Sequence, residues 1–397
     1  MKPLEGIRVL DIATYIAAPY CATIMAEFGA EVIKVEMPGV GDPCRRLGSA
    51  TEAGDTLVWL SEARNKKSIT LNLKDPKGKE MLKQLVAKAD VLCENFRPGT
   101  LEKWDLGWDV LNSVNPKLVM LRVSGYGQTG PYSEQPGFGR IGNAFGGISF
   151  LAGDPDRPPA TPGSATLADY MSGLYGALGV IMALRSAEAT GVGQQVDIGL
   201  YEPIFRILDE LAPAYDKFGF VRQRMGAPTV NVCPHSHYPT GDDRWVAIAC
   251  TNDKIFARLA KLMGQEDVAG DGRYGTIQQR EADRSGVDGM VEAWTRRHKQ
   301  KEVVELCAEG EVPCGIVAAI DEIFEDPQYA ARENIVRVQD ARAGEIAVPN
   351  VVPRLTGTPG SVDTLGPALG ANNAEIFGVL LGLGAKDLET LTGEGVI

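Results

Sequence analysis

The chain has 397 residues, of which 44% are hydrophobic and 23% are charged, and its formal net charge is −12. This length exceeds the usual size of one hydrophobic core and predicts two domains. The acidic balance disfavours nucleic acid and anionic membrane surfaces as partners, because both attract basic proteins. Since every window of 18 residues contains a charge or a turn former, no membrane-spanning helix is expected.

The N-terminus and the cysteines indicate a cytoplasmic protein. The chain enters a strand-like run at once, without an apolar signal region. The seven cysteines are an odd count, and none has the two-residue spacing of a zinc or redox motif. With only three histidines in the chain, we expect no metal site and no tightly bound cofactor.

Strand and helix patterns alternate through the first 125 residues, which predicts an α/β fold with an open, mostly parallel sheet. Buried strands are predicted at 7–13, 31–36, 90–94 and 118–124. Helices are predicted at 18–28, closed by Gly29, and at 76–89, where Pro76 stands near the start.

The rest of the chain is more varied. Residues 127–165 are rich in Gly and Pro and predict a long ordered loop. Helices are expected at 167–186 and 195–212, and a polar boundary at 220–240. A second α/β unit follows, with strands at 244–250 and 314–318 and helices at 253–263, 287–297 and 301–309. After residue 330 the pattern is irregular until a helix at 374–383.

Three common enzyme motifs are missing. The turn after the first strand reads ATYIAAPY and has none of the glycines that a dinucleotide-binding turn needs. No Walker-type loop ends in Lys-Ser or Lys-Thr, and no Gly-x-Ser-x-Gly elbow surrounds a serine. Nucleotide oxidoreductases, P-loop enzymes and serine hydrolases are therefore disfavoured.

Asp169 stands out among the carboxylates because a Gly-rich loop leads into its apolar helix. Thr166 and Asp169 have the spacing of a capping box, so one interpretation is a helix cap. The other is a nucleophile, because the helix N-terminus favours an ionised carboxylate that can attack an acyl group. Spacing alone leaves both open.

Two short stretches, 64–74 and 94–103, gather the cations Lys66, Lys67, Lys74, Arg97 and Lys103. In an acidic protein such cations could bind phosphate, or they could be solvated loop charges.

Motifs in a fixed order resemble the class III CoA-transferases, the family of formyl-CoA transferase and crotonobetainyl-CoA:carnitine CoA-transferase. The matching segments include LEGIRVLDIATYIAAPY, FGAEVIKVEMPGVGD, ADVLCENFRPGTLEKWDLGWDVL, LADYMSGLYGALGVIMAL and VPCGIVAAIDEIFEDPQ, and they span nearly the whole chain.

The resemblance implies a fold and a set of site residues. It implies a large domain with a Rossmann-like sheet at 1–220, a smaller α/β domain at 221–330, and a C-terminal segment, 331–397, that returns to the large domain. It also implies an interlocked homodimer, with acyl-CoA and a carboxylic acid as substrates and coenzyme A as substrate and product. Asp169 takes the place of the nucleophile, which forms a mixed anhydride and then an enzyme-bound CoA thioester. The implied CoA-binding residues are Ile16, Ala17, Leu71, Lys74, Asn95, Phe96, Arg97 and Lys103.

Two departures from the family narrow the activity. Related acyl-CoA racemases carry a His-Asp pair where this chain has Phe138 and Gly139, which disfavours a racemase or isomerase because the base is missing. The glycine-rich loop of formyl-CoA transferase is replaced by NVCPHSHYPTG, which disfavours oxalate as acceptor.

The substrate hypothesis follows from these departures. His235, His237 or Arg140 could hold the second carboxylate of a larger acid, which suggests succinyl-CoA and a C4–C6 diacid, although the histidines could equally be structural. A CoA-binding protein without turnover remains an alternative, disfavoured by the intact setting of Asp169.

Overall fold

The computed structural model describes residues 2–163 and 166–397. The chain forms two compact units. The first combines 1–149, 161–221 and 328–397, and the second combines 150–160 and 222–327. Each unit has its own hydrophobic core.

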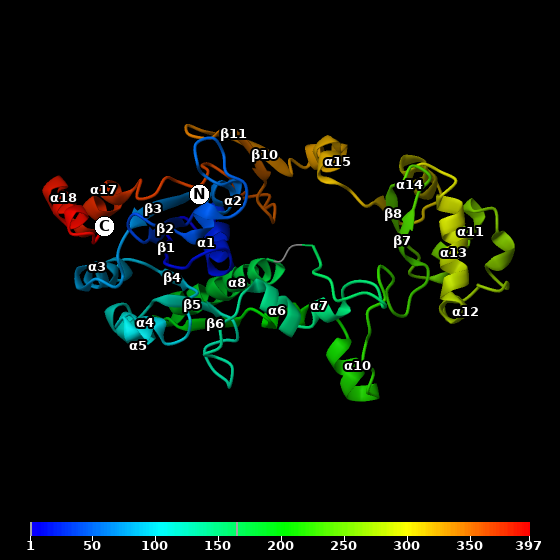
Figure 1. The fold of residues 1–397 in the computed structure, drawn as a ribbon, viewed down its shortest axis with the longest axis horizontal. Helices are drawn as coiled ribbons and strands as arrows, with labels where there is room; N and C mark the ends of the chain where they lie inside the picture. Colours follow the sequence, from blue (N-terminus) through cyan, green and yellow to red (C-terminus); the bar gives the residue numbers. More distant parts are fainter. Residues whose placement is uncertain (1, 164–165) are drawn as a thin grey trace. The chain divides into compact units, whose positions relative to one another are not determined.

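A six-stranded parallel sheet forms the centre of the first unit (Figure 1). Its strands, in the spatial order β3-β2-β1-β4-β5-β6, are β3 (Lys66–Thr70), β2 (Glu31–Glu36), β1 (Arg8–Asp11), β4 (Val91–Glu94), β5 (Val119–Ser124) and β6 (Gln195–Gly199). All five neighbouring pairs are parallel. This is the order of the doubly wound Rossmann sheet, and the winding direction reverses between β1 and β4. The α/β prediction with a parallel sheet is therefore confirmed.

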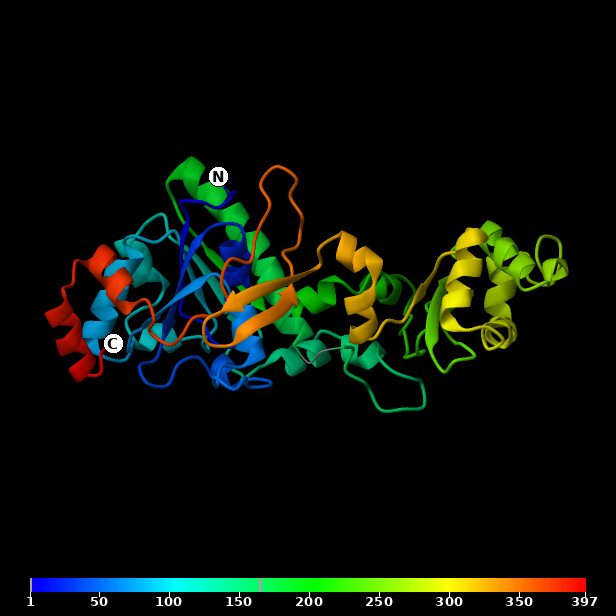
Figure 2. The ribbon, with the colours of Figure 1, turned by 90° about the horizontal axis from the view of Figure 1, so that it is seen from above.

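Helices cover both faces of this sheet. Alternate side chains of β1 point to opposite faces, so Val9 joins the core beneath α1 (Ala17–Glu27) and α8 (Leu167–Thr190), whereas Leu10 joins the core on the other face. That other face is covered by α3 (Pro76–Val86), α4 (Thr100–Lys103), α5 (Trp108–Val114), α17 (Asn373–Ile376), the π-helical turn η3 (Phe377–Leu381) and α18 (Ala385–Gly393). Both ribbon views show the red C-terminal helices beside α3 (Figures 1 and 2), and Lys77 of α3 pairs with Glu394 at 2.6 Å.

Among the described residues, α8 is the one helix long and apolar enough to cross a membrane by length and composition. One face of α8 packs against α1. Small residues make this contact possible: a Cβ added at Gly173 would lie 2.6 Å from the Ala17 carbonyl oxygen, and one at Gly176 would lie 2.9 Å from the Leu121 side chain.

The strands predicted from apolar runs are confirmed as β1, β2, β4 and β5, but other predictions for this unit were wrong. The helix expected at 195–212 is the strand β6 followed by α9 (Glu202–Arg206), with α10 (Leu211–Phe218) after it. The loop expected at 127–165 contains α6 (Gly139–Phe145) and α7 (Ile148–Leu151). The irregular stretch after 330 contains a hairpin of β10 (Ile335–Asp340) and β11 (Gly344–Pro349). Short elements η1 (Pro43–Arg46) and α2 (Leu57–Glu62) complete the unit.

The second unit is a small antiparallel sheet packed with helices. Its strands are β7 (His235–Pro239), β8 (Trp245–Ala249) and β9 (Cys314–Ile316). Its helical elements are α11 (Asp253–Leu262), η2 (Glu266–Val268), α12 (Ile277–Ala282), α13 (Arg284–Thr295), α14 (Gln300–Glu309) and α15 (Ile320–Glu325), and α16 (Pro327–Ala331) follows at the boundary.

Candidate active site

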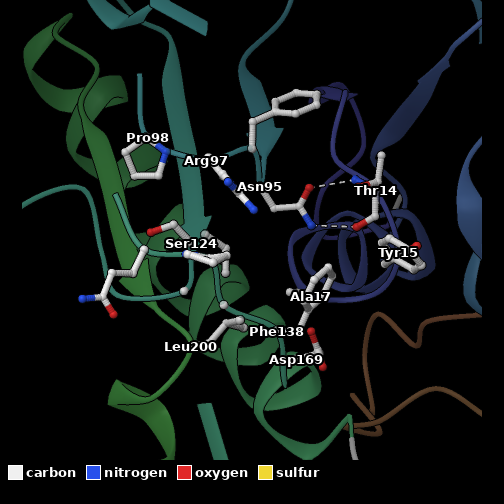
Figure 3. A pocket seen from close by; sticks show the side chains of 16 residues that line it. Thr14, Tyr15, Ala17, Asn95, Arg97, Pro98, Ser124, Phe138, Asp169 and Leu200 are labelled. Atoms are coloured by element: carbon white, nitrogen blue, oxygen red, sulfur yellow. Dashed lines mark hydrogen bonds between the residues drawn. The ribbon is translucent and has the colours of Figure 1, made fainter. Parts of the chain in front are cut away.

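A cavity of about 260 Å³ opens at the point where the winding of the parallel sheet reverses. Ligands of open α/β sheets bind at such a point, beyond the carboxyl ends of the strands. Residues at or after the ends of four strands line it: Thr14, Tyr15 and Ala17 after β1; Asn95, Phe96, Arg97 and Pro98 after β4; Val123, Ser124 and Gly125 at β5; and Leu200 after β6. Residues 135–138 and Asp169 complete the lining (Figure 3). Of the described residues that line this cavity, Asp169 is the one carboxylate and Arg97 the one cation.

Asp169 lies in the first turn of α8 and faces the cavity with a half-buried side chain. Burial raises its pKa from 3.8 to about 6, although its own backbone N–H acts in the opposite direction. The helix amide therefore favours the ionised carboxylate, as predicted, but desolvation outweighs this contribution and the pKa rises overall. Thr166 is the N-cap residue, but no side-chain capping hydrogen bond forms at this helix start, so the capping box is not observed.

The structure brings several of the predicted CoA-binding residues together. Ala17, Asn95, Phe96 and Arg97 line the Asp169 cavity. A second cavity of about 500 Å³ is lined by Leu71 and Lys74 and shares Thr14, Phe96 and Arg97 with the first, so the two adjoin.

Ile16 and Lys103 line neither cavity. The Ile16 side chain is buried against Trp59 and Cys44, and Lys103 is exposed on α4.

The cations of the two basic stretches differ in burial and pairing. Lys66 is buried in β3, a strand that was missed in the sequence, and pairs with Asp11 at 2.9 Å. Lys67 pairs with Glu31 and Glu375, at 2.9 and 2.6 Å. Neither lysine is therefore available for phosphate, whereas Lys74, Arg97 and Lys103 have exposed side chains.

A model of CoA-transferase family III matches residues 4–373. The chain belongs to the class III CoA-transferase family. It is 52% identical over its whole length to the succinyl-CoA–L-malate CoA-transferase beta subunit of Chloroflexus aurantiacus and covers 98% of that protein. It is 46% identical to the succinyl-CoA–D-citramalate CoA-transferase of the same bacterium, again covering 98%. A CaiB/BaiF family crystal structure from Brucella suis superposes with a TM-score of 0.85 at 32% identity, over 96% of this chain and 99% of that one.

The protein is therefore a CoA-transferase, and Phe138 agrees with transfer rather than racemisation. Its ring lies at the cavity wall, where it meets the Tyr15 ring edge to face at 6.2 Å. A phenyl ring cannot take a proton from a substrate carbon, and no histidine is among the described residues that line the transferase cavity.

The residues predicted to hold the second carboxylate of the acid do not line the Asp169 cavity. Arg140 is exposed on α6 and donates to Thr161 Oγ1 at 3.3 Å. His235 and His237 lie on β7 of the second unit, where His235 is half-buried and His237 exposed. Within the described parts of the chain, no group of three or more His, Cys, Asp or Glu residues could hold a metal ion.

Tyr15, Ser124 and Gln135 of the transferase cavity were missed in the sequence. Ser124 could have been found, because it ends the predicted strand 118–124 and strand ends meet at one edge of a parallel sheet. Gln135 reaches the cavity through a close backbone contact between Gly125 and Gly137, where an added Cβ would lie 2.6 to 2.8 Å from the facing Cα. Two glycines twelve residues apart give no local signal of that contact.

Proposed function

We propose that this CoA-transferase moves CoA from succinyl-CoA to a small hydroxydicarboxylate such as L-malate or D-citramalate, with Asp169 as its nucleophile. The observation that carries the proposal is that Asp169 is the one carboxylate among the described lining residues of the cavity at the sheet's reversal point. The names of the relatives at 46–52% identity support the substrate pair. Both acceptors are C4–C5 dicarboxylates, which agrees with the diacid hypothesis.

The proposed chemistry runs through two covalent states of Asp169. The ionised carboxylate attacks the thioester carbonyl of succinyl-CoA, the C–S bond breaks, and a mixed anhydride and CoA thiolate result. The thiolate attacks the aspartyl carbonyl, which releases succinate and leaves CoA as a thioester on Asp169. The acceptor carboxylate attacks that thioester to form a second mixed anhydride. The released thiolate then attacks the acceptor's carbonyl, which frees Asp169 and gives the acceptor's CoA thioester.

The exposed cations of the two adjoining cavities fit an anionic CoA ester, because the carboxylates of Glu36 and Asp42, which also line the second cavity, are paired with Arg45 and Lys34. Arg97 lines both cavities and Lys74 lines the second, and both side chains are exposed. They provide local positive charge in a protein of net charge −12. We assign the CoA-binding role to the predicted residues Ala17, Leu71, Lys74, Phe96 and Arg97, which line these cavities, with Arg97 and Lys74 as the phosphate contacts.

An exposed apolar face of α8 supports the proposal that the protein forms a homodimer, interlocked as in the family. Leu174, Leu178, Ile181 and Met182 follow helical spacing on one side of α8, and their exposed fractions lie between 44% and 62%. Monomeric proteins rarely leave such a contiguous apolar surface uncovered. One relative is named as a beta subunit, so the test must use this chain alone and measure both its mass in solution and its activity.

Mass spectrometry of the intact protein tests the proposal. Incubation with succinyl-CoA should add the mass of CoA, less water, to Asp169, and hydroxylamine should remove the adduct. Asp169→Ala should neither form the adduct nor transfer CoA, whereas Asp90→Ala, a change outside the cavity, is the matched control. Normal transfer by Asp169→Ala would refute the role of Asp169. A panel of CoA donors crossed with carboxylic acids would refute the substrate pair if succinyl-CoA gave no product with any C4–C5 dicarboxylate.

A further inference from the structure

The turn that joins β1 to α1, residues 12–16, is held largely by polar side chains, two of which come from the loops after β2 and β4. The Thr14 N–H donates to Asn95 Oδ1 at 2.8 Å, and Asn95 Nδ2 donates to the Thr14 carbonyl at 2.6 Å (Figure 3). The Tyr15 N–H donates to Asp42 Oδ1 at 3.0 Å. Tyr15 has a φ of 62°, a left-handed conformation that a non-glycine residue adopts only when its surroundings enforce it.

Buried charges stand behind the Asp42 contact. Lys34, with 1% of its side chain exposed, pairs with Asp42 Oδ2 at 2.8 Å and with Asp11 Oδ1 at 3.4 Å. Lys34 Nζ also donates to the Ala13 carbonyl, and the Ala13 N–H donates to Asp11 Oδ1 at 3.2 Å. Five successive backbone groups, from the Ala13 N–H to the Tyr15 N–H, are thus each bound by a polar side chain.

Besides pairing with one another, these buried charged residues bind the β1–α1 turn. Removing charges from water costs several kcal/mol per ion, and a well-packed apolar replacement is often as stable. Asp11, Lys34 and Asp42 each also bind a backbone group of the turn, although Asp42 Oδ1 in addition accepts from the Cys44 N–H at the start of η1. Burial acts to raise the pKa of Asp11, but Lys34 and Lys66 outweigh it and lower that pKa, so Asp11 stays ionised. The turn is therefore bound by buried charged side chains, which cannot move away from one another without leaving a charge unpaired.

The β1–α1 turn forms part of the surroundings of Asp169. Thr14, Tyr15 and Ala17 line the cavity that Asp169 faces. The Ala17 carbonyl lies against Gly173, where an added Cβ would be only 2.6 Å away. Gly173 is four residues after Asp169, one helical turn along the same face of α8. A displaced turn would therefore change the distance between the cavity wall and the attacking carboxylate.

We propose that Asn95 and Asp42 are positioning residues for CoA transfer, because they clamp the β1–α1 turn from its two sides and so set the wall of the Asp169 cavity. This rests on the proposed function of Asp169. It also assigns Asn95 a different role from CoA contact, since both polar atoms of its side chain bind Thr14.

Steady-state kinetics of Asn95→Ala and Asp42→Ala distinguishes positioning from CoA binding. A misplacement of about 1 Å can lower a rate about 10²-fold, so we expect kcat to fall by that order while the KM for succinyl-CoA changes little. A raised KM with an unchanged kcat would overturn the proposal, because it indicates lost ground-state binding. Asp42→Asn keeps an oxygen acceptor for the Tyr15 N–H and should recover most of the kcat that Asp42→Ala loses.

A matched control separates positioning from loss of stability. Asn115→Ala removes an amide that also binds two backbone carbonyls, those of Val86 and Ala89, but that lies outside both cavities. It should lower the Tm without lowering kcat. An equal fall in kcat for Asn115→Ala and Asn95→Ala at equal Tm would overturn the proposal. The CoA adduct on Asp169 distinguishes the failure of this proposal from the failure of the proposed function. If the wild-type protein forms no adduct, the proposed function is rejected. If Asn95→Ala forms the adduct at the wild-type rate, only the positioning role of Asn95 is rejected.

Discussion

Asp169→Asn should abolish CoA transfer and stabilise the protein at alkaline pH. Burial raises the pKa of Asp169 from 3.8 to about 6, so the folded protein binds this proton more tightly than the unfolded chain. Its stability therefore falls as pH rises from about 4 to about 6, and above pH 6 the full cost is present. A shift of about two pKa units corresponds to at most about 3 kcal/mol. Solvent reaches the half-buried side chain, so we expect Asp169→Asn to gain about 1–3 kcal/mol at pH 8.

The measurement is the difference in unfolding midpoint between Asp169→Asn and wild type from pH 4 to pH 8. The difference should grow as pH rises through 4 to 6 and then level off, because asparagine does not titrate. Asp271→Asn, in an exposed turn of the second unit, is the control and should show no such growth. Two results would refute the argument that the buried, ionised carboxylate of Asp169 lowers the stability of the fold. One is a difference in unfolding midpoint that does not change with pH, and the other is an Asp169→Asn protein that is less stable than wild type at pH 8.

The same pKa predicts the pH dependence of activity. At pH 5 about 9% of an aspartate with a pKa of about 6 is ionised, against about 94% for one at 3.8. The kcat/KM for succinyl-CoA should therefore fall about tenfold between pH 8 and pH 5, with an apparent pKa near 6. A rate that stays constant down to pH 5 would refute the raised pKa, because an aspartate at its ordinary value of 3.8 is still almost fully ionised there.

Three further changes test other parts of the structure. Glu94→Ala should destabilise the fold by about 1.5–3 kcal/mol in urea unfolding, because buried Arg122 loses a charged hydrogen-bond partner at 2.7 Å and keeps only its pair with the partly exposed Glu102; unchanged stability would contradict the ion pair's role. Leu178→Glu on the exposed face of α8 should keep the proposed interlocked dimer from assembling, so that light scattering of refolded protein shows monomer or aggregate; a dimer of wild-type mass and Tm would exclude this face from the interface. Arg97→Ala should raise the KM for succinyl-CoA about 10- to 100-fold, the loss expected for a hydrogen bond to a charged group. An equal loss with Lys117→Ala, which lies outside both cavities, would contradict a specific contact.

The strands that the sequence predicted are those whose burial can be read from local composition. β1, β2, β4 and β5 carry apolar runs because both faces of a parallel sheet are covered. β3 was missed because its sequence KKSIT begins with two lysines. Lys66 is tolerated inside the sheet only because Asp11, 55 residues earlier in the chain, supplies the opposite charge.

β6 was missed for a different reason. It is the edge strand of the sheet, and its first three residues are exposed or only partly buried. Its polar residues therefore gave no strand pattern, and its apolar ones merged with those of α9 into an apparent helix. An edge strand is defined by its neighbour, here β5, rather than by its own composition.

The sequence by itself determined the family, the parallel α/β sheet and Asp169 as the candidate nucleophile, because ordered motifs and apolar runs are local properties of the chain. Tertiary structure decided the direction of the Asp169 pKa shift, because burial outweighs the helix amide. It also decided which cations are free: Lys66 and Lys67 lie near Lys74 in sequence, yet partners from distant strands and helices neutralise the first two. Desolvation and ion pairing depend on groups that approach only when the chain folds, so no spacing rule could have given either result.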